Sequence, residues 1–306
     1  MSAWPVLPPL ADWRPTADAV HLWTQALGKI RLDRMPWINH AWHAALTVSP
    51  RGLTTGLLPA DGVEVELDVV GERLRVRSAS GAEWGFALGP MSVADFFRQT
   101  LDALAEAGVE PRVWPEPVEI PGPVVPFPDD HAVRPYDAEA VRAFWGALRQ
   151  AHRVMTTFRA RFVGKASPVH FFWGAFDLAA TRFSGRPAPP HPGGAPNLAD
   201  WVMREAYSQE VSSAGLWPGG DLGEAHFYAY AYPEPNGFRE HPVEPAAARY
   251  DADLGEYLLP YEAVRTADDP DAALLAFLQT TYEAAAEHAG WDRAALEREL
   301  PPSPGR

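Results

Sequence analysis

The densest concentration of reactive side chains in this 306-residue chain lies between residues 164 and 186, where the sequence is GKASPVHFFWGAFDLAATRFSGR. Alternation along a strand would place Arg182, Ser184 and Arg186 on one face. Two guanidinium groups and a hydroxyl arranged in this way form a fork for a carboxylate or a phosphate. We therefore predict a binding site for a small anionic molecule. The alternative is that both arginines form structural ion pairs with acidic residues such as Asp177 or Glu210.

His170 and Glu210 are the candidates for acid–base catalysis. A histidine can exchange protons near neutral pH, and Glu210 lies in a segment that could close over a pocket. Lys165 would anchor the anion or, where desolvated, act as an amine nucleophile. The alternatives are that His170 is a hydrogen-bonded core residue and that Glu210 serves in local loop hydrogen bonds. Whether the protein is an enzyme is left open.

Aromatic side chains stand near these charged candidates. Core packing is the first explanation of the 12 tryptophans. Aromatic walls with a few convergent polar groups are also what a small-molecule pocket needs. We expect such a pocket between the two halves of the chain, lined in addition by Lys29, Trp42, Arg51, Trp173, Tyr207, Trp217 and Tyr228.

No cofactor or metal site is predicted. The absence of cysteine excludes disulfides, thiolate zinc sites and iron–sulfur clusters. Neither Gly28-Lys29 nor Gly164-Lys165 lies in a phosphate-binding loop motif, and the Gly-x-Ser-x-Gly motif of serine hydrolases is missing. The pairs His40/His43 and Glu224/His226 are weak candidates for metal ligands, and the sequence leaves both open.

Two further stretches accompany the 164–186 segment. Residues 207–219 follow the pattern Tyr-Ser-x-Glu-x-Ser-Ser-x-Gly-x-Trp-Pro-Gly, and residues 227–230 read Phe-Tyr-Ala-Tyr. With these three stretches the chain resembles, over nearly its whole length, a bacterial family known only as a domain of unknown function. The resemblance implies a shared architecture and no particular reaction.

The elements that position these residues recur in the two halves. Lys29 is followed by an apolar run from Trp42 to Arg51, and Lys165 by one from Trp173 to Arg182; the tryptophan and the arginine are nine residues apart in both runs. Each half also ends in an amphipathic helix, over 93–107 and 271–289. The pattern predicts an α+β fold of two related halves, each a helix, an antiparallel sheet and a helix, with an internal pseudo-duplication and helices covering the sheets.

Local patterns predict further elements. Alternating residues over 63–69 and 73–78 predict a hairpin around Gly71 and Glu72, and residues 225–232 alternate as a strand.

The chain is predicted to divide into a first half over residues 1–113 and a second half over 136–306, joined by a proline-rich linker over 114–135. An insertion over about 186–223, with a helical patch at 198–207, is predicted to be a packed lid.

Charge and hydropathy limit the partners. The net charge of -14 disfavours nucleic acid and anionic lipid surfaces. No signal peptide or membrane-spanning stretch is visible, which predicts a cytoplasmic protein without a membrane partner. The rival to an anion-binding protein is a non-catalytic module for protein–protein interaction. The oligomeric state is left open.

Overall fold

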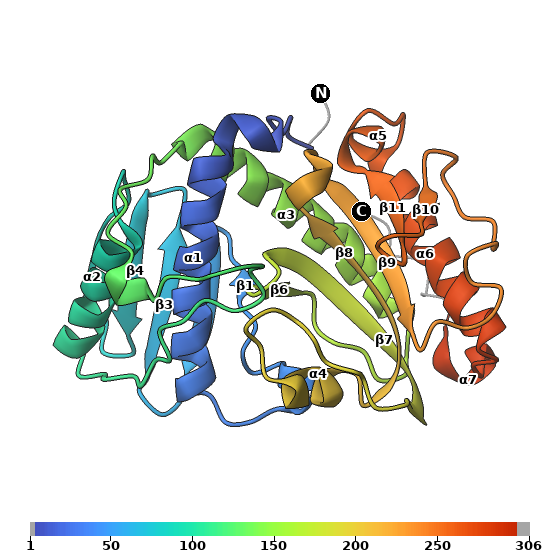
Figure 1. Cartoon of the computed structure of the whole chain (residues 1–306), viewed down its shortest axis with the longest axis horizontal. Helices are drawn as coiled ribbons and strands as arrows, with labels where there is room; N and C mark the ends of the chain where they lie inside the picture. Colours follow the sequence, from blue (N-terminus) through green and yellow to red (C-terminus); the bar gives the residue numbers. More distant parts are fainter. Residues whose placement is uncertain (1–3, 299–306) are drawn as a thin grey trace.

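The first half of the chain forms the N-terminal sheet, a five-stranded antiparallel meander. The structure is a computed structural model and describes residues 4–298 (Figure 1). The strands follow one another across the sheet in chain order. They are β1 (Thr47–Val48), β2 (Gly52–Leu58), β3 (Val63–Asp68), β4 (Arg73–Ser78) and β5 (Glu83–Ala87). The predicted hairpin is confirmed as β3 and β4, which pair from Val63↔Ser78 to Asp68↔Arg73.

Helices precede and follow this sheet. They are α1 (Leu10–Arg34), η1 (Asn39–Ala41), α2 (Val93–Glu106) and η2 (Phe127–Asp129). The Ser92 side chain caps α2 by accepting a hydrogen bond from the Asp95 amide, and the helix buries Phe97 and Leu104. The predicted closing helix of the first half is therefore confirmed, with its apolar stripe facing the protein interior.

The second half forms the C-terminal sheet, which has six antiparallel strands in the order β10-β11-β9-β8-β7-β6. Its strands are β6 (His170–Phe172), β7 (Asp177–Pro187), β8 (Gln209–Trp217), β9 (His226–Tyr232), β10 (Arg249–Asp251) and β11 (Glu256–Pro260). The helices of this half are α3 (Ala138–Ala160), α4 (Asp200–Ala206), η3 (Gly220–Leu222), α5 (Tyr261–Arg265), α6 (Pro270–His288) and α7 (Arg293–Leu296).

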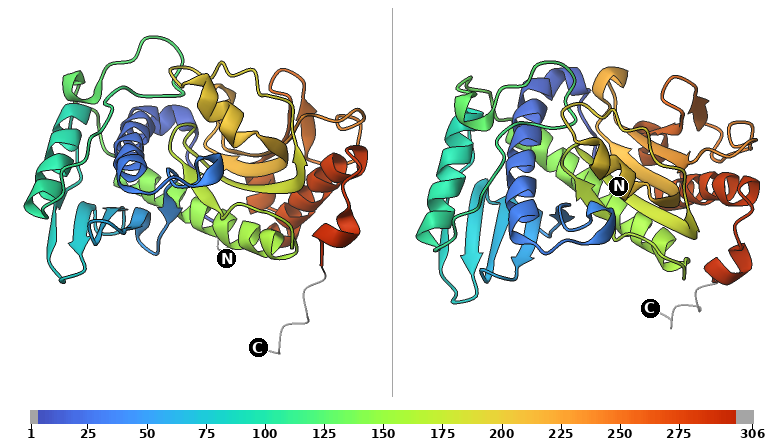
Figure 2. Two further views of the ribbon diagram at one scale, coloured as in Figure 1. Left: turned by 90° about the horizontal axis from the view of Figure 1, so that it is seen from below. Right: turned by 60° about the horizontal axis from the view of Figure 1, so that its bottom comes forward.

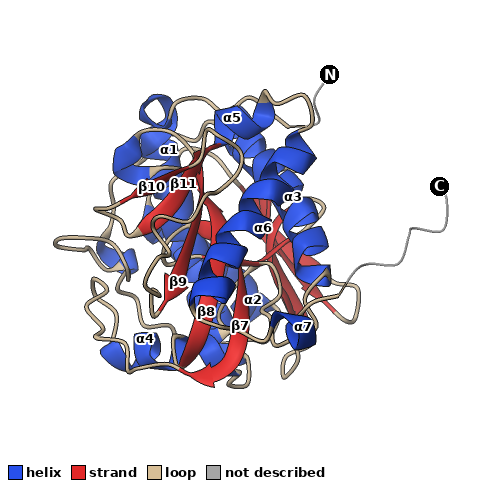
Figure 3. Cartoon of the chain, turned by 90° about the vertical axis from the view of Figure 1, so that its right-hand side faces the viewer, coloured by secondary structure: helices blue, strands red, loops and turns tan. Residues whose placement is uncertain are grey.

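The two faces of the C-terminal sheet have different surroundings. Figure 3 shows α3 and α6 on one side of β7, β8 and β9, and α4 on the other. We call these the helix face and the lid face. Because side chains alternate along a strand, Leu178, Ala180 and Arg182 of β7 point to the helix face. Thr181 and Phe183 point to the lid face.

The predicted insertion is shorter than expected. Residues 209–217, assigned from the sequence to the insertion over 186–223, form β8 in the middle of the C-terminal sheet. The centre of this strand is Ser-Ser-Ala-Gly, which lacks the β-branched residues that identify strands in a sequence. Residues 188–208 and 218–223 of the predicted insertion lie outside the strands, and the first of these stretches contains the predicted short helix as α4.

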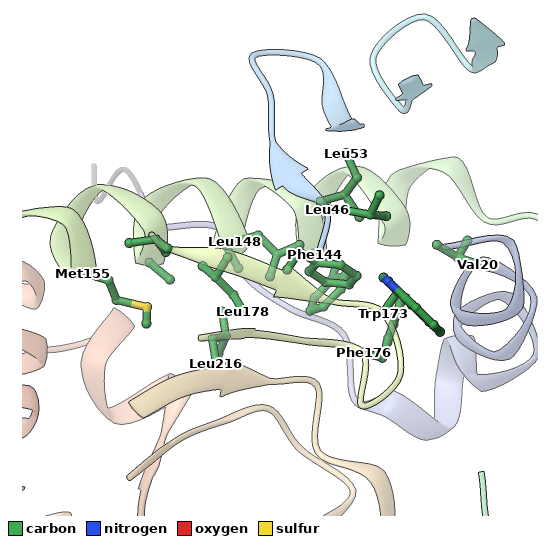
Figure 4. Packing of buried hydrophobic residues seen from close by; sticks show 14 of the residues in the cluster. Val20, Leu46, Leu53, Phe144, Leu148, Met155, Trp173, Phe176, Leu178 and Leu216 are labelled. Carbon is green, nitrogen blue, oxygen red and sulfur yellow. The ribbon is translucent and has the colours of Figure 1, made fainter. Parts of the chain in front are cut away.

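One continuous hydrophobic core joins the two sheets. Figure 4 shows Phe144 and Leu148 of α3 between Leu178 of the C-terminal sheet and Leu46, which precedes β1. Leu46 and Phe171 also exchange backbone hydrogen bonds of 2.9 and 2.8 Å, which link the first strand regions of both sheets. Helix α1 lies beside this junction (Figure 2) and contacts β2, α2 and α3.

The predicted α+β class is confirmed by these two antiparallel sheets and their helices. Both halves follow the order helix, sheet, helix, but the sheets have five and six strands, so the pseudo-duplication stays a prediction. The predicted domain boundaries also stay predictions; between α2 and α3 the only helical segment is η2. Within residues 4–298, no helix combines the length and the apolar composition needed to cross a membrane.

Candidate functional site

The structure separates the cationic residues that the sequence grouped together. Arg182 lies on the helix face, whereas Lys165 contacts Phe183, a lid-face residue. Arg186 lies near the end of β7, where its guanidinium donates to Glu210 at 2.7 and 2.9 Å. The predicted fork of Arg182, Ser184 and Arg186 is not formed, because the pairing of β7 with β8 shifts register between Phe183 and Pro187.

Arg182 is the most deeply buried cation of the predicted set, at 2% exposure. Its guanidinium carbon lies 3.4 Å from the centre of the Phe158 ring and 4.3 Å from that of Tyr282. One nitrogen donates to the Phe158 carbonyl, whereas Nε has no hydrogen-bond partner among the described residues. Burial is the main reason that the pKa of Arg182 is lowered to about 9.

A cavity of about 830 Å³ opens beside this guanidinium. We call it the arginine pocket, and its lining consists of Arg161, Arg182, Gln279, Arg293, Ala294, Glu297 and Arg298. Backbone hydrogen bonds hold its rim, since Val163 donates to Leu296 at 2.8 Å and Arg298 donates to Arg161 at 3.0 Å. These bonds tie the end of α3 to α7, so the arginines come from segments far apart in the chain.

The positive charge of the arginine pocket is only partly compensated. Arg293 binds three carboxylates, those of Glu283, Glu287 and Glu297, at 2.9, 2.5 and 2.6 Å. In contrast, Arg161, Arg182 and Arg298 form no ion pair within residues 4–298. Three unpaired guanidinium groups therefore border one cavity, in a chain whose net charge is -14.

Lys165 lies in a second group of side chains, on the lid face. Its Nζ is 2.5 Å from Nε2 of His40 and 3.2 Å from Oε1 of Gln209. The amine also lies 5.8 Å from the centre of the Trp42 ring and 5.0 Å from that of Phe183. Burial lowers the pKa of Lys165, with Glu205 opposing the shift. The structure thus brings together Lys165 and Trp42, as the sequence predicted, and adds His40 and Gln209.

His40 reaches Lys165 from η1, where its φ of 59° is left-handed. Its Nδ1 is 3.1 and 3.0 Å from the carbonyl oxygens of Glu205 and Ala206, so the ring proton resides on Nδ1 and Nε2 accepts from Lys165. The pair His40/His43, a weak metal candidate in the sequence, is divided between two sets of partners: His40 binds Lys165, and His43 contacts the backbone of Ile38. A single short turn that contains the left-handed residues His40 and Ala41 leaves no periodic signal in the sequence.

His170, the predicted base, lies beside this group and is 5% exposed. Its ring is 6.4 Å from that of Trp42, and its Nδ1 has no hydrogen-bond partner among the described residues. Burial, assisted by Arg31 and Arg159, lowers the pKa of His170 to about 4. A neutral imidazole at this position is able to accept a proton only at low pH.

The remaining predicted residues lie in separate places. Burial lowers the pKa of Lys29 to about 8, and its amine faces the Trp173 ring at 5.6 Å. Arg51 pairs with Asp68 in the N-terminal sheet at 2.8 Å. The hydroxyl of Ser184 accepts from the Arg186 amide at 3.0 Å, a local contact within the strand.

Tyr228 and Trp217 lie on the lid face of β9 and β8. Tyr228 donates a hydrogen bond to Asp177, a residue predicted from the sequence as a partner for arginine. Tyr207, after α4, donates to or accepts from Tyr230 at 2.6 Å. The weak metal candidate Glu224/His226 brings Nε2 only to 3.8 Å from the carboxylate. No group of three metal-binding side chains occurs within the described part of the chain.

Comparison with known proteins places the chain in a family. A family model described as a family of unknown function (DUF5996) matches residues 4–298. The chain therefore belongs to this family, which confirms the resemblance found in the sequence. No curated protein and no solved structure matches the chain.

Proposed function

We propose that this member of the DUF5996 family binds a small anionic, partly apolar molecule in the arginine pocket. The observation that carries the proposal is the buried, unpaired guanidinium of Arg182 at the wall of an 830 Å³ cavity. The carboxylate that acts on Arg182 is that of Glu297, which is bound by Arg293. A buried charge with so little compensation is costly, and an anionic ligand would supply a further counter-ion.

The lining favours a carboxylate or a phosphate. Guanidinium groups bind both with paired hydrogen bonds, and Arg161 and Arg298 are exposed and unpaired at the rim within the described residues. Ala294 provides apolar surface in the lining for the rest of the ligand, while the buried rings of Phe158 and Tyr282 hold the Arg182 guanidinium from beneath. The cavity volume lies in the range typical of small-molecule sites.

Catalysis is not part of this proposal. His170 lies on β6 and Glu210 is bound to Arg186, and neither lines the arginine pocket. Their roles as acid and base therefore stay predictions from the sequence. The arginine pocket itself contains one carboxylate, Glu297, which is held by Arg293 and by the Tyr282 hydroxyl at 2.9 Å.

The proposal is tested with phenyl phosphate, benzoate and inorganic phosphate as ligands and phenol as a neutral comparison. We expect the anions to raise the melting temperature of the protein and phenol to leave it unchanged, because binding to the folded state stabilises it. Phenyl phosphate should bind more tightly than inorganic phosphate, since its ring adds apolar contact.

Two exposed pocket residues and one matched control identify the site. Arg161→Ala and Arg298→Ala should weaken phenyl phosphate binding severalfold in isothermal titration calorimetry, about the effect of one charge-assisted hydrogen bond each. Arg186→Ala removes the same charge from β7 but lies outside the pocket, so its affinity should equal that of the unchanged protein. Equal losses in all three variants, or no binding of any anion, would contradict the proposal.

A further inference from the structure

A second polar site lies on the lid face, where Tyr228 of β9 reaches across β8 to Asp177 of β7. The strand between them presents Gly215 at the crossing point. A Cβ atom at Gly215 would lie 2.4 Å from the Tyr228 hydroxyl oxygen, so only glycine leaves room for the ring. The packing of three strands therefore holds the Tyr228 hydroxyl against the Asp177 carboxyl.

A parallel row of hydroxyl groups lies two residues further along the strands. Thr181, Ser213 and Tyr230 are register partners on β7, β8 and β9. The Thr181 and Ser213 hydroxyls are 2.9 Å apart, Ser213 hydrogen-bonds Tyr230, and Tyr230 meets the Tyr207 hydroxyl at 2.6 Å. The rings of Tyr228 and Tyr230 lie 11° from parallel, with centres 6.1 Å apart.

Two more carboxyl groups face these rows. Glu256 lies on β11, next to β9, and its charge acts on Tyr207, Tyr228 and Tyr230. Glu119 comes from the proline-rich segment before α3 and has a left-handed φ of 59°. A Cβ atom at Gly174 would lie 2.0 Å from Glu119 Oε1, so the absence of a side chain at that position admits this carboxyl.

The segment that carries Glu119 is attached to the residues before α4. The Glu119 amide donates to the Pro196 carbonyl at 2.7 Å, and the Asn197 side chain donates to the Ile120 carbonyl at 3.3 Å. Left-handed backbone at a glutamate costs about 1 kcal/mol or more, so these contacts hold Glu119 in place against local strain. We call Glu119, Asp177, Tyr207, Tyr228, Tyr230 and Glu256 the carboxyl–tyrosine cluster.

The carboxyl groups of the cluster lack positive partners. The charges that act on Asp177 and Glu256 are those of other carboxyls. Two histidines lie nearby, His191 stacked on Tyr207 at 4.8 Å and His21 at 2.9 Å from the Gly174 carbonyl, and burial lowers the pKa of each, which favours the neutral ring. Asp177 is 6% exposed, and its Oδ1 has no hydrogen-bond partner among the described residues. The Asp177 carboxyl accepts from the Tyr228 hydroxyl and its own amide, and the charges of Glu119 and Glu256 act on this part of the sheet from either side.

We propose that the carboxyl–tyrosine cluster binds the primary ammonium group of an organic amine. The buried, unpartnered Oδ1 of Asp177 and the half-buried carboxyls of Glu119 and Glu256 can accept hydrogen bonds from the N–H groups of an ammonium ion, and tyrosine rings attract cations through their faces. A quaternary ammonium ion has no N–H to donate and so fits the cluster less well. This site is independent of the arginine pocket, because the two lie on opposite faces of the same sheet.

The charge state of the cluster links binding to pH. Burial raises the pKa of Asp177 and of Glu256 to about 7 each and also raises that of Glu119. Asp251 of β10 adds negative charge beside Glu256, and Tyr207, Tyr228 and Tyr230 are neutral in this range because their pKa values are raised. An ammonium ion therefore binds the ionised carboxyls and should bind more tightly at pH 8 than at pH 6.

Isothermal titration calorimetry of the full chain with putrescine tests the proposal, with tetramethylammonium as the quaternary comparison. We expect putrescine to bind at least about tenfold more tightly than tetramethylammonium, because only its N–H groups pair with the carboxyl oxygens. No heat with putrescine at millimolar concentration, or equal affinity for both cations, would overturn the proposal.

Substitutions that each remove one negative charge locate the site. Asp177→Asn and Glu256→Gln should weaken putrescine binding at least about tenfold, whereas Asp253→Asn in the exposed β10–β11 turn should leave it unchanged. Near-ultraviolet circular dichroism of each variant checks that the fold is retained. If Asp177→Asn does not fold, the affinity of Glu256→Gln for putrescine tests the site. An equal loss for Asp253→Asn would indicate general attraction to an acidic protein and would overturn the proposal.

Discussion

Replacing Arg182 by methionine should stabilise the protein while removing its anion site. Methionine is unbranched and close in length, so it can fill the space between Phe158 and Tyr282 that the guanidinium now occupies. The Phe158 carbonyl keeps a partner after the substitution, because the Arg161 amide also donates to it at 3.2 Å. The change therefore exchanges a buried charge for apolar contact without leaving a buried acceptor unpaired.

The expected magnitude follows from the cost of the buried charge. A pKa lowered to about 9 corresponds to roughly 5 kcal/mol against the charged form of Arg182. The ring contacts and the hydrogen bond to Phe158 offset about 3 to 4 kcal/mol of this. The substitution should then raise the free energy of unfolding by about 1–2 kcal/mol, in line with other replacements of buried charges by apolar residues.

Urea denaturation measures this difference, since urea is uncharged and does not screen electrostatic interactions. Arg186→Met is the matched control on the same strand, where the arginine is exposed and paired with Glu210; its stability should change by no more than about 0.5 kcal/mol. Binding of phenyl phosphate to Arg182→Met should be lost. A variant that is less stable than the unchanged chain by about 1 kcal/mol or more would show that Arg182 is a structural residue and refute the reasoning.

Three further substitutions test the energetics of the C-terminal sheet. Burial raises the pKa of Asp177 from 3.8 to about 7, so the folded state retains a proton that the unfolded chain releases, and stability falls as pH rises through this window. The free energy of unfolding of Asp177→Asn, relative to that of the unchanged chain, should therefore rise by up to about 4 kcal/mol between pH 4 and pH 8 in urea titrations. A difference between the two proteins that does not vary with pH would contradict this. For His170 the sign is opposite: its pKa falls from 6.5 to about 4, so stability is lost as pH falls through that range. His170→Gln should reduce the acid-induced loss by about 3 kcal/mol, and an unaltered pH profile of unfolding would count against a buried, neutral imidazole. Gly215→Ala would bring a Cβ atom to 2.3 Å from the Leu178 carbonyl oxygen and 2.4 Å from the Tyr228 hydroxyl oxygen. Gly215→Ala should lower the free energy of unfolding by about 1–3 kcal/mol, measured by thermal or urea unfolding. A variant as stable as the unchanged chain would show that the Tyr228 side chain is free to move.

Short-range patterns in the amino-acid sequence were sufficient to predict several elements of this protein. The hairpin of β3 and β4 and the strand β9 were predicted from alternating apolar and polar residues. The helices α2 and α6 were predicted from apolar residues that recur every three or four positions. Such a period is a property of a few consecutive residues, so it can be read without knowing what the element packs against. The same reading failed for β8, whose small central residues are explained only by Tyr228 lying across Gly215.

The composition of both candidate sites, in contrast, was decided by the tertiary structure. The sequence pointed to Arg182, but its neighbours Arg161 and Arg298 come together only because backbone hydrogen bonds join the end of α3 to the segment after α7. The charge of Glu119 acts on Asp177 because the absence of a side chain at Gly174 admits the Glu119 carboxyl beside the turn before β7. Strand register and long-range packing determine which residue types share a face or a cavity, and neither leaves a mark on the local sequence.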